Sequence, residues 1–291
     1  MAEWTIGVIG GSGLYALPGL ETVETLTFET PWGAPSAPLV KGRLGTVKFV
    51  FLPRHGQGHR LSPTAVPYQA NIDALKRAGC TDLLSVSACG SLQEQYAPGD
   101  FVMVDQFIDR TFARKKSFFG PGMVAHVSMA DPVCSRLSAL AGNAAEAVKA
   151  KVHRGGTYLT MEGPQFSSRA ESALYRQWGC DVIGMTNAPE AKLAREAELP
   201  YATLAMVTDY DCWREDEAAV DVTSVLDVMA RNTAKAQETI LQLAQALQDV
   251  PRTPSPQGIE TCLDHALITA PEARDPEVIK RLDAVAGRVL G

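Results

Sequence analysis

Two carboxylates one residue apart follow an apolar run in the sequence LAMVTDYDCW, where Asp209 and Asp211 come directly after it. In extended backbone, alternate side chains project to the same side, so we expect the pair to face one ligand. Neighbouring carboxylates in a partly dry pocket repel, and one then tends to take up a proton and donate a hydrogen bond. Adenine presents an N7 acceptor beside an N6 donor, which this pair would complement. A solvated acidic loop and a calcium site are the alternatives.

Two further strand ends carry groups suited to an anion. The glycine turn at residues 10–13 offers backbone N–H groups and the Ser12 hydroxyl, and the sequence LPRHG places Arg54 and His55 after another apolar run. An arginine fork suits a phosphate bidentately, and the histidine adds a donor. The turn lacks the GxGxxG pattern and the lysine of an ATP-binding loop. A tight turn chosen for backbone freedom and a solvated Arg–His pair are the alternatives.

Polar or aromatic residues follow other predicted strands as well. The sequence SACGSL offers the Ser87 hydroxyl and the Ala88 N–H, and EGPQFSS offers Phe166 and Ser167. Phe166 could stack on a planar base, although an ordinary core phenylalanine is the alternative. In open α/β sheets, ligands bind outside the carboxyl ends of the strands, so we expect these loops to share one site.

The elements that must position these residues alternate between strand and helix. Apolar runs at 4–9, 48–53, 81–91, 101–109 and 201–209 predict strands, and residues 67–79, 132–151 and 188–199 have helical spacing. The pattern predicts one α/β domain over residues 1–250, with a mixed central sheet flanked by helices and a long amphipathic helix over 222–250. Residues 251–291 form a proline-rich break and a C-terminal extension, in which Asp275 and Pro276 start a short helix.

Composition excludes several classes of protein. A net charge of −6 argues against a nucleic-acid surface. No apolar stretch approaches the roughly 20 residues that span a bilayer, so no membrane segment and a cytoplasmic location are expected. The six cysteines are scattered without CxxC spacing, which indicates neither a metal site nor a disulfide framework.

Eight ordered blocks carry a resemblance to a known family: VIGGSGL, RHGQGH, YQANIDALKRAGC, SACGSL, GDFVMVDQFIDRT, EGPQFSSRAES, MTNAPEAKLAREA and TDYDCW. Over about residues 5–245 the chain resembles the trimeric purine nucleoside phosphorylase family, in its branch that acts on 5'-methylthioadenosine. The resemblance implies that inorganic phosphate, as co-substrate, attacks C1' and releases adenine and 5-methylthioribose 1-phosphate. It implies no metal, no organic cofactor, and a homotrimer with its sites at the subunit interfaces.

Residue roles follow from the same resemblance, position by position. It implies a phosphate site made of Ser12, Arg54, His55, Ser87, Ala88 and Thr186. It places Met185 against the ribose, Phe166 and Ser167 along the base, Asp209 at N7 and Asp211 at N6. It implies an apolar methylthio pocket of Val222, Val225 and Leu226, and a contribution of His126 from the neighbouring subunit.

Other functions stay open on the sequence alone. A phosphorylase for methylthioinosine or 6-oxopurine nucleosides is the nearest, but related 6-oxopurine enzymes place an asparagine where Asp209 stands. A nucleoside hydrolase would use water and would not need the anion site, and a non-catalytic nucleotide-binding module would bind without turnover. Residues 251–291 extend past the usual end of the family core. They could cap the active site, stabilise the trimer or contact another protein, and a helix packed on its own subunit is the simplest expectation.

Overall fold

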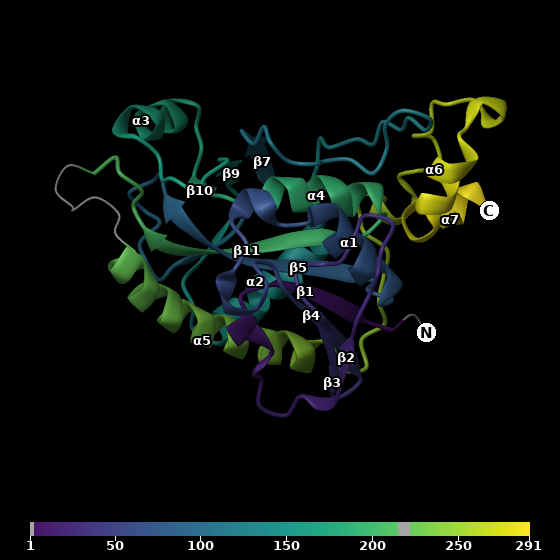
Figure 1. Ribbon diagram of the computed structural model, residues 1–291. Coiled ribbons are helices and arrows are strands. Elements are labelled where there is room, and N and C mark those ends of the chain that lie inside the picture. Colours follow the sequence, from purple (N-terminus) through teal and green to yellow (C-terminus); the bar gives the residue numbers. More distant parts are fainter. Residues whose placement is uncertain (1–2, 215–221) are drawn as a thin grey trace.

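One mixed β-sheet organises the part of the chain that the computed structural model describes, residues 3–214 and 222–291, without the side chains of Ser12 and residues 222–225 (Figure 1). Its centre is a parallel set of four strands, in the spatial order β4, β1, β5 and β11: β4 (Val47–Pro53), β1 (Thr5–Gly10), β5 (Asp82–Ser91) and β11 (Tyr201–Asp209). These strands are buried on both faces, which explains their nearly continuous apolar sequences. The predicted mixed α/β sheet is confirmed.

Shorter strands extend the sheet on both sides of this centre. β10 (Val182–Gly184) runs antiparallel to the end of β5, and β9 (Thr157–Thr160) and β7 (Gln106–Asp109) follow it outward. β6 (Phe101–Met103) and β8 (Val152–Arg154) lie beyond β11. β2 (Glu21–Leu26) and β3 (Leu39–Leu44) form an antiparallel edge beside β4. The run at 101–109 therefore forms two strands, β6 and β7.

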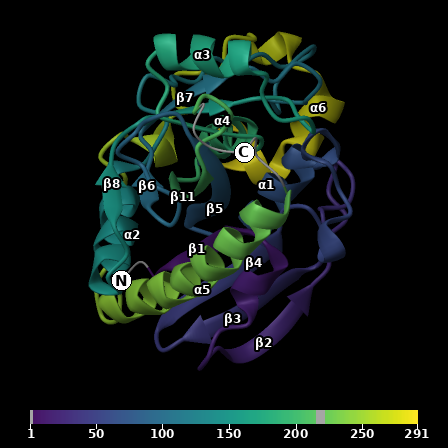
Figure 2. The same ribbon diagram turned by 90° about the vertical axis from the view of Figure 1, so that its left-hand side faces the viewer.

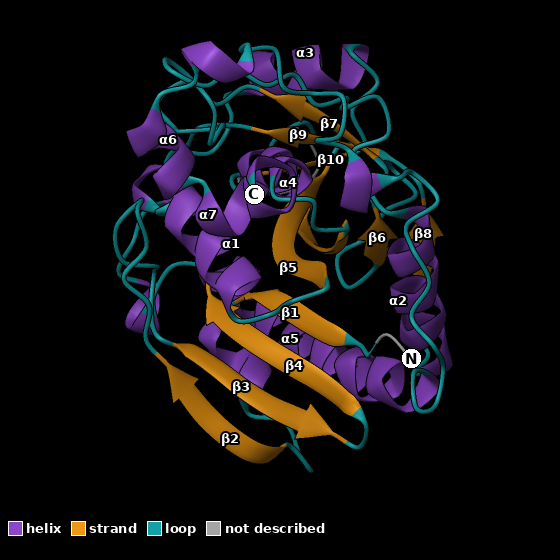
Figure 3. Ribbon diagram, turned by 90° about the vertical axis from the view of Figure 1, so that its right-hand side faces the viewer, coloured by secondary structure: helices purple, strands orange, loops and turns teal. Residues whose placement is uncertain are grey.

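Helices cover both faces of the sheet (Figure 2) (Figure 3). α2 (Ser135–Ala147) and α5 (Val222–Ala246) share one apolar layer with alternate residues of the central strands. α1 (Tyr68–Arg77), α4 (Asn187–Glu196) and α7 (Asp283–Leu290) share the layer on the opposite face, and α3 (Arg169–Gln177) lies near the end of β10. None of the helices described here is long and apolar enough to cross a membrane.

The C-terminal extension packs against its own chain. As predicted, the Asp275 side chain caps a helix that begins with Pro276, but this helix breaks at Leu282 into α6 (Pro276–Arg281) and α7. Leu282 and Val285 are fully buried in the layer that contains α1 and α4. Arg252 donates to the buried Asp82 carboxylate at the start of β5, at 2.5 Å. Burial and ion pairing therefore fix the extension on this face of the sheet.

Candidate active site

The carboxyl ends of the parallel strands meet around β5. Backbone contacts join the end of β4 to the end of β1, since the Arg54 N–H donates to the Gly10 carbonyl at 2.9 Å. β11 ends opposite β5, with Asp209 paired to Gly90. β10 runs alongside β5 in the opposite direction, and a Cβ atom built on its last residue, Gly184, would lie 3.4 Å from the Ala88 carbonyl oxygen. The predicted loops therefore converge at the carboxyl ends of the central parallel strands.

Arg54 is buried there, and its guanidinium is already paired. Nε and Nη2 both donate to the Glu190 carboxylate, and Nη2 also donates to Ser85 Oγ at 2.5 Å. Burial alone would lower the pKa of Arg54, but the Glu190 carboxylate raises it. The fork that we expected to grip a phosphate bidentately therefore faces a glutamate. Within the described chain, Nη1 donates only to the Val86 carbonyl, at 3.2 Å, and is the end available to an anion.

His55 is held as a neutral ring. Its Nδ1 lies 2.8 Å from the Leu61 carbonyl oxygen, which only accepts, so Nδ1 carries the proton. Burial, and then the charge of Arg54, lower the pKa of His55 to about 4. Nε2 therefore presents a lone pair at neutral pH. This corrects the sequence-based expectation of a second donor: His55 accepts a hydrogen bond, for example from a protonated phosphate oxygen.

Hydroxyl groups and a helix terminus complete the surroundings of an anion. Ser87 is buried, and its Oγ has no hydrogen-bond partner within the described residues. Thr186 precedes α4, but its side chain does not cap the helix and instead donates to Asn187 Oδ1 at 3.2 Å. The first N–H groups of a helix attract an anion. The Ser12 side chain lies outside the described residues. Arg54 Nη1 thus lies beside the residue before Ser87, and Ser85 links this strand to Asn187, next to Thr186; their joint binding of phosphate stays a prediction.

The two aspartates are arranged differently from the expected extended strand. β11 ends at Asp209, and Asp211 follows in a turn with φ of 52°, in the left-handed region. Asp209 Oδ1 accepts from the Asp211 N–H at 2.8 Å, and Oδ2 accepts from Thr208 Oγ1 at 2.7 Å. The side chain of Asp209 thus closes the turn that places Asp211. The expectation of two carboxylates side by side on one strand was wrong because a tight turn intervenes.

Gly90 gives the Asp209 carboxylate its room. The pairing of β11 with β5 shifts register between Val207 and Asp209, which brings the carboxylate against the backbone of β5. A Cβ atom on Gly90 would lie 2.9 Å from Asp209 Oδ1, closer than ordinary van der Waals contact. Only glycine therefore accommodates this position of the acid.

Asp211 is the more buried of the two aspartates. Burial raises the pKa of its carboxyl above the ordinary value, although the nearby Ser172 and Ser167 hydroxyls oppose that shift. The Cys212 thiol donates to the Ser167 carbonyl at 3.1 Å and links this turn to the loop at 161–167. Ser167 therefore lies beside Asp211, as the predicted base site requires.

A residue that the sequence analysis did not select holds the loop at 161–167 against Met185. The buried Arg114 guanidinium donates to the carbonyls of Met161, Glu162 and Met185, and its Nε pairs with Glu162 Oε1 at 3.0 Å. Gly163 lies directly against the Met185 thioether. Phe166, on the same loop, is 46% exposed. Arg114 is internal in the sequence RTFARKK and gives no local signal of this role.

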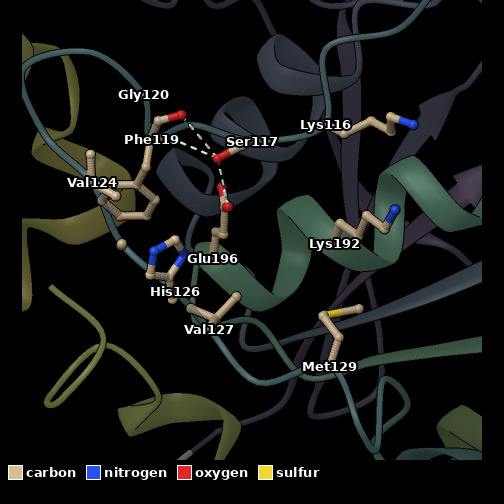
Figure 4. A pocket seen from close by; sticks show the side chains of 11 residues that line it. Lys116, Ser117, Phe119, Gly120, Val124, His126, Val127, Met129, Lys192 and Glu196 are labelled. Carbon is tan, nitrogen blue, oxygen red and sulfur yellow. Dashed lines mark hydrogen bonds between the residues drawn. The ribbon is translucent and has the colours of Figure 1, made fainter. Parts of the chain in front are cut away.

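His126 lies away from these residues. It lines a cavity of about 420 Å³ together with Glu196, at the C-terminal end of α4 (Figure 4). Thr186 precedes the other end of this ten-residue helix, a separation of about 15 Å at 1.5 Å per residue. Within one subunit, therefore, His126 does not join the anion site.

The predicted methylthio pocket is described only in part. Leu226 stands on the first turns of α5 and is 54% exposed. The side chains of Val222 and Val225 lie outside the described residues. Further along the helix, Asn232 donates to the Val207 carbonyl at 2.9 Å, which fixes α5 beside the end of β11.

An α/β sheet with polar loops gathered at the carboxyl ends of its strands is typical of proteins that bind a small ligand there. Comparison with known families agrees with this class. The chain belongs to the phosphorylase superfamily, whose family model matches residues 5–245. Two relatives are the S-methyl-5'-thioadenosine phosphorylases of Cereibacter sphaeroides, 61% identical over 98% of both chains, and of Bradyrhizobium diazoefficiens, 58% identical over 100% of this chain and 99% of the relative.

Solved structures show the same likeness. A methylthioadenosine phosphorylase from an Antarctic soil metagenomic library is 47% identical, with a TM-score of 0.91 over 98% of this chain and 99% of that one. A methylthioadenosine phosphorylase from Schistosoma mansoni in complex with adenine is 37% identical, with a TM-score of 0.85 over 90% of this chain and 98% of that one. The alignments with the bacterial relatives include most or all of residues 251–291, so the extension past the family model is shared with those proteins.

Proposed function

We propose that this chain catalyses the phosphorolysis of 5'-methylthioadenosine to adenine and 5-methylthioribose 1-phosphate. The observation that carries the proposal is the placement of an acid and an anion site along one strand. Gly90 contacts Asp209, and Val86 accepts from Arg54, which puts the two groups about 13 Å apart along β5 at roughly 3.3 Å per residue. A sugar fits between them. The names of the relatives and the adenine bound to the Schistosoma protein support the same reaction.

In the proposed reaction, a phosphate oxygen forms a bond to C1' while the bond from C1' to the purine N9 breaks. Positive charge develops on the ribosyl ring and negative charge on the leaving purine, and each needs a partner. Phosphate faces the sugar from Ser87, Thr186 and Arg54 Nη1, and a proton on phosphate can be donated to His55 Nε2. Asp209 donates a proton or a strong hydrogen bond to N7, as a general acid.

Selectivity for adenine rests on the acid pair and its surroundings. Asp211 accepts from the exocyclic N6 amine through a carboxyl oxygen, and Met185 lies against the ribose. Hypoxanthine and guanine carry an acceptor at position 6, which a carboxylate would repel. The combination therefore favours methylthioadenosine over methylthioinosine and over 6-oxopurine nucleosides.

A cytoplasmic homotrimer is part of the proposal. His126 and Thr186 flank opposite ends of α4, so His126 can complete only the site of a neighbouring subunit, as the resemblance implies. Its cavity also exposes the apolar side chain of Val124, which a second copy would cover. All six cysteines are unpaired thiols, which fits a reducing compartment.

The test is to incubate the purified protein with methylthioadenosine, with and without inorganic phosphate, and to measure release of free adenine. Phosphate-dependent release, with methylthioadenosine preferred over adenosine and methylthioinosine, is the expected result. Release at the same rate without phosphate would identify a hydrolase, and binding without turnover would identify a non-catalytic module. Size-exclusion chromatography with light scattering measures the subunit number, and a monomer that turns over at full rate would refute the shared site.

A further inference from the structure

Glu190 is a buried acid within α4 to which the reaction above assigns no role. It is 2% exposed, and its carboxylate receives hydrogen bonds from four donors on three residues. Arg54 donates through Nε and Nη2, Ser85 Oγ donates at 3.0 Å, and the Tyr201 hydroxyl donates at 3.1 Å. A fully paired buried carboxylate of this kind holds its partners in one geometry.

The geometry that it fixes is the direction of Arg54. An arginine fork at a phosphate site would ordinarily bind two phosphate oxygens through Nε and one Nη. Here Glu190 faces that fork, so the guanidinium presents Nη1, beside the Val86 carbonyl and one residue before Ser87. The anion then meets a single fixed N–H group rather than a fork that can rotate.

The same cluster extends to the other side of the anion site. Ser85 Oγ, which bonds both Arg54 and Glu190, lies 3.4 Å from Asn187 Oδ1. Asn187 Oδ1 also accepts from the Thr186 hydroxyl at 3.2 Å. Arg54 and Thr186, both assigned to phosphate, are thus connected through the buried side chains of Ser85 and Asn187, and Glu190 pairs with Arg54.

We propose that Glu190 is a positioning residue for phosphate: it occupies the fork of Arg54 and so fixes Nη1 toward the incoming anion, and through Ser85 and Asn187 it holds Thr186 in place at the start of α4. This inference rests on the proposed phosphorolysis. Glu190 itself does not touch the substrate. Its loss should therefore weaken the use of phosphate and leave recognition of the nucleoside nearly unchanged.

The experiment compares Glu190→Gln and Tyr201→Phe with the wild type. Glu190→Gln replaces the charged partner of Arg54 with a neutral one, and hydrogen bonds to charged groups are stronger than those to neutral groups. KM for phosphate should therefore rise about 10- to 100-fold in Glu190→Gln, with KM for methylthioadenosine changed less than about 3-fold. Tyr201→Phe keeps the charge pair and removes one hydrogen bond from Glu190, so it should show a smaller change in the same direction. A second readout is the rise in Tm on adding inorganic phosphate, which should shrink in both variants.

Glu198→Gln is the matched control. Glu198 is another buried glutamate paired with an arginine, Arg288, but it lies on the side of the C-terminal extension. This control should lose Tm and keep the wild-type KM for phosphate. If Glu190→Gln does not fold, Tyr201→Phe decides.

Unchanged KM for phosphate and unchanged phosphate-induced stabilisation in the folded variants would overturn the positioning role. Wild-type adenine release that ignores phosphate would instead overturn the proposed function, and the two failures are therefore distinguishable.

Discussion

Gly90→Ala tests whether the position of the Asp209 carboxylate controls the rate. The added Cβ atom would lie 2.9 Å from Asp209 Oδ1, whereas ordinary contact begins at 3.4 Å, so the carboxylate must move by about 0.5 Å. A misplacement of 1 Å can cost about 100-fold in rate, so half of it predicts a loss of roughly 10-fold in kcat, or about 1.4 kcal/mol in the barrier. Crowding should also cost about 1–3 kcal/mol of stability.

The assay is steady-state adenine release at saturating phosphate and nucleoside, with thermal unfolding measured in parallel. Gly287→Ala is the control, because a Cβ atom there meets nothing within 4 Å. It should keep kcat, and its Tm should be unchanged or slightly higher, because alanine favours the helix in which Gly287 lies. The double variant Gly90→Ala/Asp209→Asn separates the causes. If the methyl group acts through the carboxylate, the double variant should lose little beyond Asp209→Asn alone.

Two results would refute this reasoning. Wild-type kcat in Gly90→Ala would show that the carboxylate position does not limit the reaction. Additive losses in the double variant would show that the methyl group acts elsewhere, for example through Ile183, whose Cγ2 would lie 3.2 Å from it.

Three further predictions concern the acids. Asp209→Asn should leave a folded protein with kcat lowered by about 10²–10⁴-fold, and near-normal turnover would exclude the acid role. Burial raises the pKa of Glu196 to about 7 from an ordinary 4.5. Between these two values the folded state keeps a proton that the unfolded chain loses, so the contribution of Glu196 to stability falls as the pH rises from 4.5 to about 7. Relative to wild type, Glu196→Gln should therefore gain a few °C in Tm between pH 5 and 8, and a pH-independent difference would contradict this. Asp82→Asn should lose about 3–5 kcal/mol of stability in denaturant unfolding, because the Arg136 and Arg252 side chains lose their buried partner, and a loss below 1 kcal/mol would argue against that pairing.

The central strands and their flanking helices could be predicted because their sequences are apolar at the spacing that burial requires. The edge strands could not. β2, with the sequence ETVETL, is almost entirely exposed, and β3 contains a lysine, a glycine and an arginine. β2 is held by its pairing with β3, and β3 by its hairpin with β4, and this context rather than local propensity makes them strands.

Candidate site residues could be named from the sequence, and their roles stay predictions, but their geometry could not be foreseen. Glu190, in the sequence APEAKLARE, resembles a surface acid of an amphipathic helix, and only the packed fold shows it facing the fork of Arg54. The tautomer of His55 depends on the Leu61 carbonyl in the same way. Asp211 departs from extended backbone because the side chain of Asp209 bonds its N–H, a competition between side chain and strand that spacing alone does not reveal.

Helix α4 has Thr186, which we propose to bind the anion, at one end and the cavity beside His126 at the other. A displacement of this rigid rod along its own axis moves both ends by the same amount. Selection for altered anion affinity would thus disturb the proposed contact between protomers, and the three catalytic centres of the proposed assembly would evolve together instead of independently.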